Sequence, residues 1–287
     1  MHWTGRRERF RVLLNGTQCV YPGSVYDAIS ARIAEDLGFE VGMFAGSVGS
    51  LSVLGAPDLI VLTLSEFAQQ AYRICRAGDL ALLVDADHGY GNALNVKRTV
   101  EELETAGVCA LTIEDTILPT PHGDAGKPRM VSIEEGAGKM RAALEGRQDP
   151  NLVIAGRTSA LTITDLDDAV ARAKAYEAVG VDAMFFTGLR TIGELDAISA
   201  ALSVPIFLGG INDALSDKSM LAAKGVRIAL QGHMPIMAAI QAVHDTLKAL
   251  RGGTPPKALT GVASRDLMAG LTRAADYRRQ TEDFLEN

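Results

Sequence analysis

Cysteine, long apolar runs and stretches of positive charge are all scarce in this chain of 287 residues. The three cysteines, Cys19, Cys75 and Cys109, are odd in number and far apart, which argues against a disulfide framework and is typical of a reducing compartment. No apolar run is long enough to cross a bilayer, and the polar residues 1–7 lack the apolar core of a signal peptide. We therefore expect a cytoplasmic protein without a membrane partner.

The charge balance excludes another class of partner. The formal net charge is −7, from 28 Lys and Arg against 35 Asp and Glu, which argues against nucleic acid as a ligand. A hydrophobic content of 47% with 22% charged residues is ordinary for a soluble globular protein. The length allows two domains, but β/α barrels often reach it as one domain.

What the sequence does contain is a regular alternation of two patterns. Short, almost continuous apolar runs are typical of parallel strands covered on both faces, and eight occur, at residues 18–21, 41–44, 80–84, 109–113, 152–155, 183–186, 205–208 and 226–230. Amphipathic helical patterns separate them, and several end at a glycine suited to a left-handed C-cap, namely Gly38, Gly107, Gly180 and Gly225. The alternation predicts a (β/α)₈ TIM-type barrel, with an open doubly wound sheet as the alternative.

The last part of the chain exceeds what eight β/α units need. We predict that residues 1–253 form the barrel and that residues 254–287, which begin near Pro255-Pro256, form a C-terminal helical extension. An apolar pattern around Leu267, Met268 and Leu271 predicts an amphipathic helix there. Such a helix could fold back on its own barrel or dock on a neighbouring subunit, and the pattern favours neither.

Two acids directly follow the third apolar run. Asp85 and Asp87 are separated by one residue, and residues i and i+2 of an extended strand face the same side. Neighbouring carboxylates repel unless a cation, a proton or a positive side chain lies between them, and Mg²⁺ prefers oxygen ligands. The pair alone could equally be two acids of a solvated loop.

Other polar residues follow the remaining strands, at the end of the barrel where such enzymes place their chemistry. They are Ser47 in a loop of small residues, Asp58, Glu114 beside Asp115, Arg157, and His233 after the eighth run. Taken singly, each acid could cap a helix, the arginine could close a structural ion pair, and the histidine could be an ordinary loop residue. Together they predict a site for a small anion that chelates a divalent cation, with Arg157 gripping a carboxylate. No lysine lies at a strand end, which argues against Schiff-base chemistry.

Several of these segments resemble the isocitrate lyase / phosphoenolpyruvate mutase superfamily. They are residues 22–28, 46–47, 54–58, 85–91, 113–115 and 155–158, in the family's order and spacing. The resemblance implies a (β/α)₈ barrel whose last helix is exchanged between subunits, usually in a homotetramer. It also implies Mg²⁺, with Mn²⁺ as an alternative, held at Asp85, with Asp58, Asp87 and Glu114 acting largely through bound water. Its substrates are small anionic 2-oxo or 2-hydroxy acids that pass through an enolate-like intermediate.

The loop after the fourth run narrows the reaction. The carbon–carbon lyases of this superfamily carry a Lys-x-Cys-Gly-His motif there, whereas residues 116–127 contain no cysteine. Those lyases also place a glutamate in the sixth-strand segment that reads Phe186-Thr187-Gly188 here. A lyase acting on a substituted malate is therefore the weaker expectation. His122 is a candidate lid residue in the same loop.

The branch that the chain resembles most is the oxaloacetate decarboxylase group, through Gln231-Gly232-His233 and the Gly-Ser-Val at residues 46–48. This resemblance implies Mg²⁺-dependent conversion of oxaloacetate to pyruvate and CO₂. Ser47 and Arg157 would grip the substrate carboxylate, and His233 would bind the carboxylate that leaves. Phosphonopyruvate mutase or hydrolase chemistry is the second enzymatic hypothesis. A catalytically silent barrel that binds a dicarboxylate is the non-enzymatic one.

Overall fold

A computed structural model describes residues 3–124 and 126–286. The chain divides into two compact units, residues 1–232 and residues 233–287, whose placement relative to one another is not determined. Each unit is therefore described by itself. None of the helices in the described ranges combines the length and the apolar character needed to cross a membrane.

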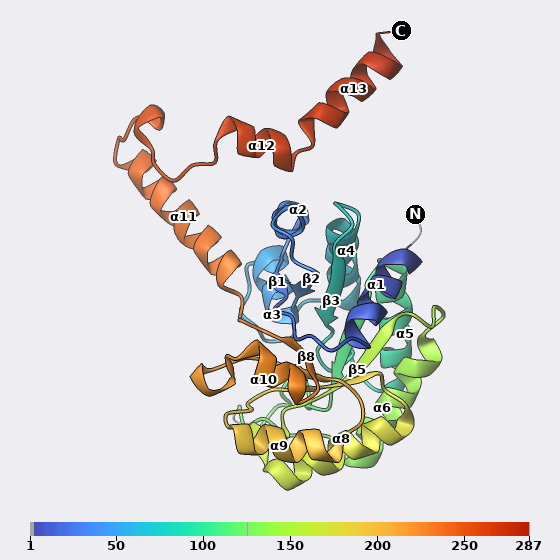
Figure 1. Ribbon diagram of the computed structural model, residues 1–287. Helices are drawn as coiled ribbons and strands as arrows, with labels where there is room; N and C mark the ends of the chain where they lie inside the picture. The colour runs from blue at the N-terminus through green and yellow to red at the C-terminus, as the bar shows by residue number, and fades with distance from the viewer. Residues whose placement is uncertain (1–2, 125, 287) are drawn as a thin grey trace. The chain divides into compact units, whose positions relative to one another are not determined.

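The first unit contains one eight-stranded sheet in which every strand pairs in parallel with the next strand along the chain (Figure 1). Val20, just before the first strand, bridges Ile228 of the last strand in parallel, which joins the two edges of the sheet. The TIM-type β/α barrel is therefore confirmed. The strands are β1 Gly23–Ser24, β2 Val41–Phe44, β3 Ala81–Asp85, β4 Ala110–Glu114, β5 Val153–Thr158, β6 Ala183–Phe186, β7 Ile206–Leu208 and β8 Val226–Ala229.

Seven of the eight predicted strands are found. Six of them lie within one residue of their predicted bounds, with β2 and β6 matching at both ends, whereas β5 ends three residues later than predicted. The first prediction, residues 18–21, is wrong. Pro22 has no N–H to donate to a ladder, so the paired strand β1 begins at Gly23. Within the predicted stretch Val20 bonds to β8 instead, since its N–H donates to Arg227 O at 2.9 Å.

Helices surround the sheet, and their apolar faces pack against it (Figure 1). On α5, a stripe formed by Val96, Val100 and Leu103 is completely buried. The four predicted C-cap glycines all have positive φ angles, between 82° and 106°. The helices of this unit are α1 Thr4–Leu14, α2 Ala28–Asp36, α3 Gly46–Gly49, the π-helical turn η1 Ser50–Leu54, α4 Leu64–Cys75, α5 Ala93–Thr105, α6 Ile133–Gly146, α7 Ala160–Ile163, α8 Leu166–Val179, α9 Ile192–Ala201, the 3₁₀ turn η2 Asp213–Leu215 and α10 Lys218–Ala223.

Helix α1, which precedes the barrel, is held by arginine side chains as well as by its apolar face. Arg7 forms an ion pair with Asp149 (Nη1–Oδ2 3.0 Å), and its Nε donates to Val108 O at 2.9 Å. Phe10 and Leu14 of the same helix are buried. Helix α1 is therefore held against the barrel by long-range hydrogen bonds as well, and its hydrophobic pattern does not predict these bonds.

The second unit is helical. It contains α11 Met234–Arg251, the 3₁₀ turn η3 Pro256–Ala258, α12 Arg265–Leu271 and α13 Ala274–Leu285. Helix α11 exposes a stripe of large apolar side chains, Met237, Ile240, Val243, Leu247 and Leu250. The predicted boundary after residue 253 falls inside this unit and stays a prediction.

Candidate active site

Three neighbouring strands of the barrel deliver charged side chains at their carboxyl ends. Asp85 is the last residue of β3, Glu114 is the last residue of β4, and Arg157 is the next-to-last residue of β5. The register aligns Glu114 with Arg157 across the β4–β5 pair, and Asp85 with Thr112 across β3–β4. Parallel strands thus bring together acids that lie 29 residues apart in the sequence, and an arginine 43 residues further on.

Arg157 is the central cation of this cluster. Its Nη1 is paired with Asp85 Oδ2, and its Nη2 lies 3.0 Å from Glu114 Oε2. The guanidinium carbon stands 5.6 Å from the centre of the Phe185 ring, over its face. Burial by itself would lower the pKa of Arg157, but the Asp85 and Glu114 carboxylates raise it above its ordinary value. The site therefore holds a permanently charged fork on an aromatic support.

Asp85 is fixed from two sides. Its Oδ2 pairs with Arg157, and its Oδ1 accepts a hydrogen bond of 2.9 Å from Thr112 Oγ1. Thr112 is fully buried on β4 and was not among the predicted site residues. The only signal for it in the sequence is its place two residues before Glu114, on the same side of the strand.

Asp87 lies beyond the end of β3, with a left-handed backbone (φ 49°), so the extended-strand argument for its orientation does not apply. Its carbonyl accepts from Glu114 N at 2.8 Å. Its carboxylate packs against Gly46, where an added Cβ would lie 2.2 Å from Oδ2. Burial, and then the charges of Asp85 and Glu114, hold the pKa of Asp87 well above its usual range.

The pKa values of the other two acids, Glu114 and Asp58, are also raised. Burial raises the pKa of Glu114 to about 7, although Arg157 opposes the shift. Burial, followed by the charge of Asp85, raises the pKa of Asp58 as well. Burial and neighbouring carboxylates together therefore disfavour the charged forms of these acids.

Two buried residues correct or extend the predicted set. Asp115, which the sequence places beside Glu114, faces away from the cluster: Tyr176 Oη donates to its Oδ2 at 2.8 Å, and Arg172 Nη1 lies 3.2 Å from the same atom. Strand alternation already predicts opposite faces for neighbours. Lys139, which the sequence reading missed, is 2% exposed on α6 and donates to Glu114 O at 3.3 Å.

The comparisons with known proteins give one consistent answer. The family model for phosphoenolpyruvate phosphomutase matches residues 10–251. The chain belongs to the phosphoenolpyruvate phosphomutase family. It is 60% identical over 285 residues to an oxaloacetate decarboxylase of Bradyrhizobium diazoefficiens, covering 99% of both chains, and 59% identical to one of Rhodopseudomonas palustris, again over 99% of both. The predicted resemblance to this superfamily and to its oxaloacetate decarboxylases is confirmed.

Solved structures of the family have the same fold. An oxaloacetate acetylhydrolase in complex with the inhibitor 3,3-difluorooxalacetate matches with a TM-score of 0.85 and 27% identity, over 98% of this chain and 97% of that one. A phosphonopyruvate hydrolase in complex with oxalate and Mg²⁺ matches with a TM-score of 0.83 and 27% identity, over 98% and 99%. Enzymes of several reactions therefore share this barrel.

The donor set in this member of the phosphoenolpyruvate phosphomutase family fits a hard divalent cation. Four carboxylates, those of Asp58, Asp85, Asp87 and Glu114, stand against the single guanidinium of Arg157. Across residues 3–124 and 126–286, no three His, Cys, Asp or Glu side chains are gathered as a ready metal-binding group. Mg²⁺ does not need one, because it keeps several waters and binds proteins through one or two carboxylates.

Two further predicted residues lie on other elements. Ser47 stands on α3 directly after Gly46, the glycine against which Asp87 packs. His233 is the N-cap residue of α11 and opens the second unit, so its predicted place beside the acids stays a prediction. The candidate lid residue His122 is exposed in the loop between β4 and α6.

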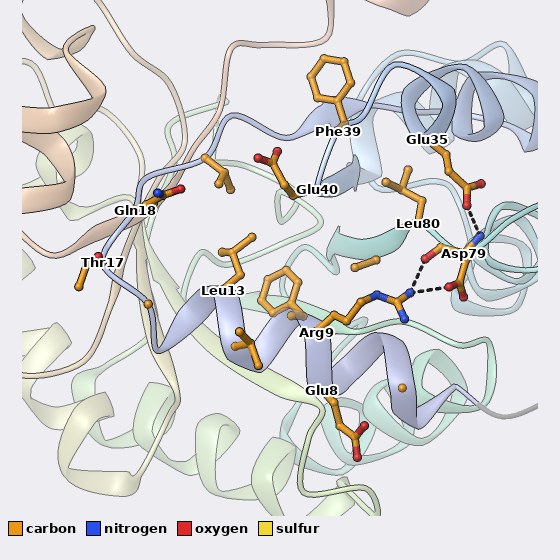
Figure 2. Close-up of a pocket in the computed structure, with 16 residues that line it drawn as sticks. Glu8, Arg9, Leu13, Thr17, Gln18, Glu35, Phe39, Glu40, Asp79 and Leu80 are labelled. Carbon is orange, nitrogen blue, oxygen red and sulfur yellow. Dashed lines mark hydrogen bonds and ion pairs between the residues drawn. The ribbon is translucent and has the colours of Figure 1, made fainter.

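A cavity of about 990 Å³ lies elsewhere, between α1 and the segments that lead into β2 and β3 (Figure 2). Three of its polar residues, Arg9, Asp79 and Glu35, bind one another. Arg9 Nη2 lies 2.8 Å from Asp79 Oδ2, and Asp79 N donates to Glu35 Oε1 at 2.8 Å. Because it adjoins the amino ends of the strands, this cavity lies at the opposite end of the barrel from the acids, and chemistry in β/α barrels takes place at the carboxyl ends.

Proposed function

We propose that the protein is a Mg²⁺-dependent lyase that decarboxylates oxaloacetate to pyruvate and CO₂. The observation that carries the proposal is the Arg157 fork held among Asp85 and Glu114 at the carboxyl ends of β3–β5. Such an arrangement suits an anion that binds an arginine and a divalent cation at once. The full-length identity of 60% to an oxaloacetate decarboxylase supports this substrate among those of the family.

Asp85 would hold the metal, with Asp58, Asp87 and Glu114 acting largely through bound water. When bound, Mg²⁺ (or Mn²⁺) supplies Lewis-acid stabilisation of the negative charge that develops on the 2-oxo oxygen of the substrate. Arg157 then exchanges its Asp85 and Glu114 partners for the substrate carboxylate, and Phe185 keeps the guanidinium in plane during that exchange.

Loss of CO₂ from a β-keto acid needs no strong base at the carbon–carbon bond. The chain agrees with this requirement, because Cys19, Cys75 and Cys109 are all free and buried and none lies in the loop after β4. Burial raises the pKa of Cys109 to about 11, so its thiol is inert near neutral pH. Ser47 would bind the retained carboxylate, and His233 would stabilise the departing one. Free thiols also favour the cytoplasm as the compartment.

The test measures the rates of oxaloacetate loss and of pyruvate formation, once with Mg²⁺ and once with excess EDTA. We expect turnover that EDTA abolishes and Mg²⁺ restores. Turnover that is independent of metal, or no turnover above the solution rate, would refute the proposal. Phosphate release or phosphoenolpyruvate formation from phosphonopyruvate would instead support phosphorus–carbon chemistry, and cleavage of 2,3-dimethylmalate would support a carbon–carbon lyase.

We further propose a homotetramer in which helices of the C-terminal unit are exchanged between subunits. The exposed stripe on α11, which includes Ile240, Val243 and Leu247, supports a second copy as its cover. Light scattering should give the mass of a tetramer for the wild type and a smaller species for Val243→Asp. A monodisperse monomer of the wild-type protein would refute it.

A further inference from the structure

Two hydroxyl groups meet at the mouth of the barrel beside the charged cluster. Ser159 directly follows β5 and Thr187 directly follows β6. Thr187 Oγ1 donates to Ser159 Oγ at 2.8 Å, and both residues are half-buried. In the part of the chain that the structure describes, the Ser159 hydroxyl accepts this bond but donates none. One hydroxyl proton at the mouth is therefore left for a ligand.

The pair lies just beyond the strand ends that carry Arg157 and Phe185. Arg157 and Phe185 are register partners, and Ser159 and Thr187 each follow two residues later in the chain. Two residues of strand span about 7 Å. A four-carbon diacid has carboxyl carbons about 4 Å apart, given C–C bonds of about 1.5 Å, so a diacid bound by Arg157 has a second carboxylate to place beyond it.

The neighbouring strand β7 packs closely against this pair. Gly209 follows β7, and a Cβ on it would lie 2.8 Å from Thr187 Cγ2 and 3.2 Å from Phe185 Cε1. A side chain at residue 209 would therefore push Thr187 and Phe185 together out of position. The absence of that side chain lets an aromatic support and a hydroxyl stack in successive layers of the barrel.

We propose that Ser159 and Thr187 form a hydroxyl clip that binds the second carboxylate of the substrate, the one remote from Arg157. This inference rests on the proposed function and names the residues that select a dicarboxylate. Neutral hydroxyl donors can hold an anion by hydrogen bonds, without the repulsion that a further carboxylate at this place would add. A carboxylate held by hydroxyls, rather than by an ion pair, can also leave as neutral CO₂ without breaking a salt bridge.

The clip is tested by comparing the binding of two ligands, of which only one extends to a carboxylate beyond the chelating end. Oxalate has the chelating end of the substrate and nothing beyond it, whereas 3,3-difluorooxalacetate has the second carboxylate as well. Calorimetry in Mg²⁺ should show that Thr187→Val and Ser159→Ala each weaken difluorooxalacetate about tenfold or more. The Kd of oxalate should stay within about twofold of the wild type.

Thr187→Ser is the matched control, because it keeps the hydroxyl and should keep wild-type affinity for both ligands. Equal losses for oxalate and difluorooxalacetate, or no loss for either, would overturn the clip. Failure of the wild type to turn over oxaloacetate would refute the decarboxylase proposal alone, since the contrast between the two ligands would still judge the clip. Melting temperatures of the variants exclude unfolding as the cause of lost binding.

Discussion

Replacing Arg157 by methionine should affect substrate and metal in opposite directions. The arginine binds Asp85 and Glu114, whose oxygens a cation would also use. A unit charge about 6 Å from Mg²⁺ repels it by about 1.4 kcal/mol in a water-like dielectric and by more in a buried site. Arg157→Met should therefore bind Mg²⁺ about tenfold more tightly or better.

The same change removes both arms of the fork that grips the substrate. Each charge-assisted hydrogen bond is worth about 1.5–3 kcal/mol, so kcat/KM for oxaloacetate should fall by about 10²–10⁴-fold. Calorimetry of Mg²⁺ binding and an assay of pyruvate formation measure the two effects. Both are best run near pH 8.5, above the raised pKa of about 7 of Glu114, so that Glu114 stays ionised.

The control is Arg172→Lys, which perturbs another buried arginine, paired with Asp115 away from the cluster. It should lower the melting temperature without changing the Kd of Mg²⁺. If Arg157→Met weakened Mg²⁺ binding instead, the arginine would be organising the acids for the metal, and the competition argument would be wrong.

Two further substitutions test the site and the fold separately. Gly46→Ala places a Cβ 2.2 Å from Asp87 Oδ2, so Mg²⁺ affinity should fall about tenfold or more, and unchanged affinity by calorimetry would refute the packing argument. Asp149→Asn should cost about 1–3 kcal/mol of unfolding free energy at pH 7, because Asp149 is hydrogen-bonded to Arg7 and Asn151 N. Burial raises the pKa of Asp149, but these hydrogen bonds lower it by more, so its pKa in the folded protein lies below 3.8. The stabilisation is complete well above that pH and is lost as pH falls through the folded pKa. The free energies of unfolding of the two proteins, measured with urea from pH 7 to pH 3, should therefore approach each other at the acid end.

The strands and the acidic residues of the site could be predicted from the sequence because they depend on local patterns. An apolar run that ends in a charged residue gives both a buried strand and its exit, which is how Asp85, Glu114 and Arg157 were predicted to meet. The prediction of the first strand at residues 18–21 was wrong because Pro22 follows directly and has no N–H to donate to a ladder, so the strand begins at Gly23. Helix α1 has little apolar periodicity, and arginines that reach backbone carbonyls about a hundred residues away hold it.

The supporting residues were not readable in the same way. Thr112, Phe185 and Lys139 touch the charged groups across strand pairs or from a covering helix. Contacts of this kind depend on the register between strands and on helix packing, neither of which a single strand's pattern fixes. Asp115 illustrates the limit, since it is a neighbour of Glu114 in sequence and yet serves a different network on the outer face of the sheet.

The charge balance of the site also orders the binding events. Four carboxylates stand against one guanidinium, and burial, followed by the charge of the neighbouring Asp85, raises the pKa values of Asp58 and Asp87. Oxaloacetate carries two carboxylates, so its entry into the site without a cation would bring like charges together. Substrate binding should therefore depend on prior binding of the metal. Oxalate binding measured with EDTA should be weaker than with Mg²⁺ by a factor of about 100 or more, and comparable affinities would mean that Arg157 alone suffices to hold the anion.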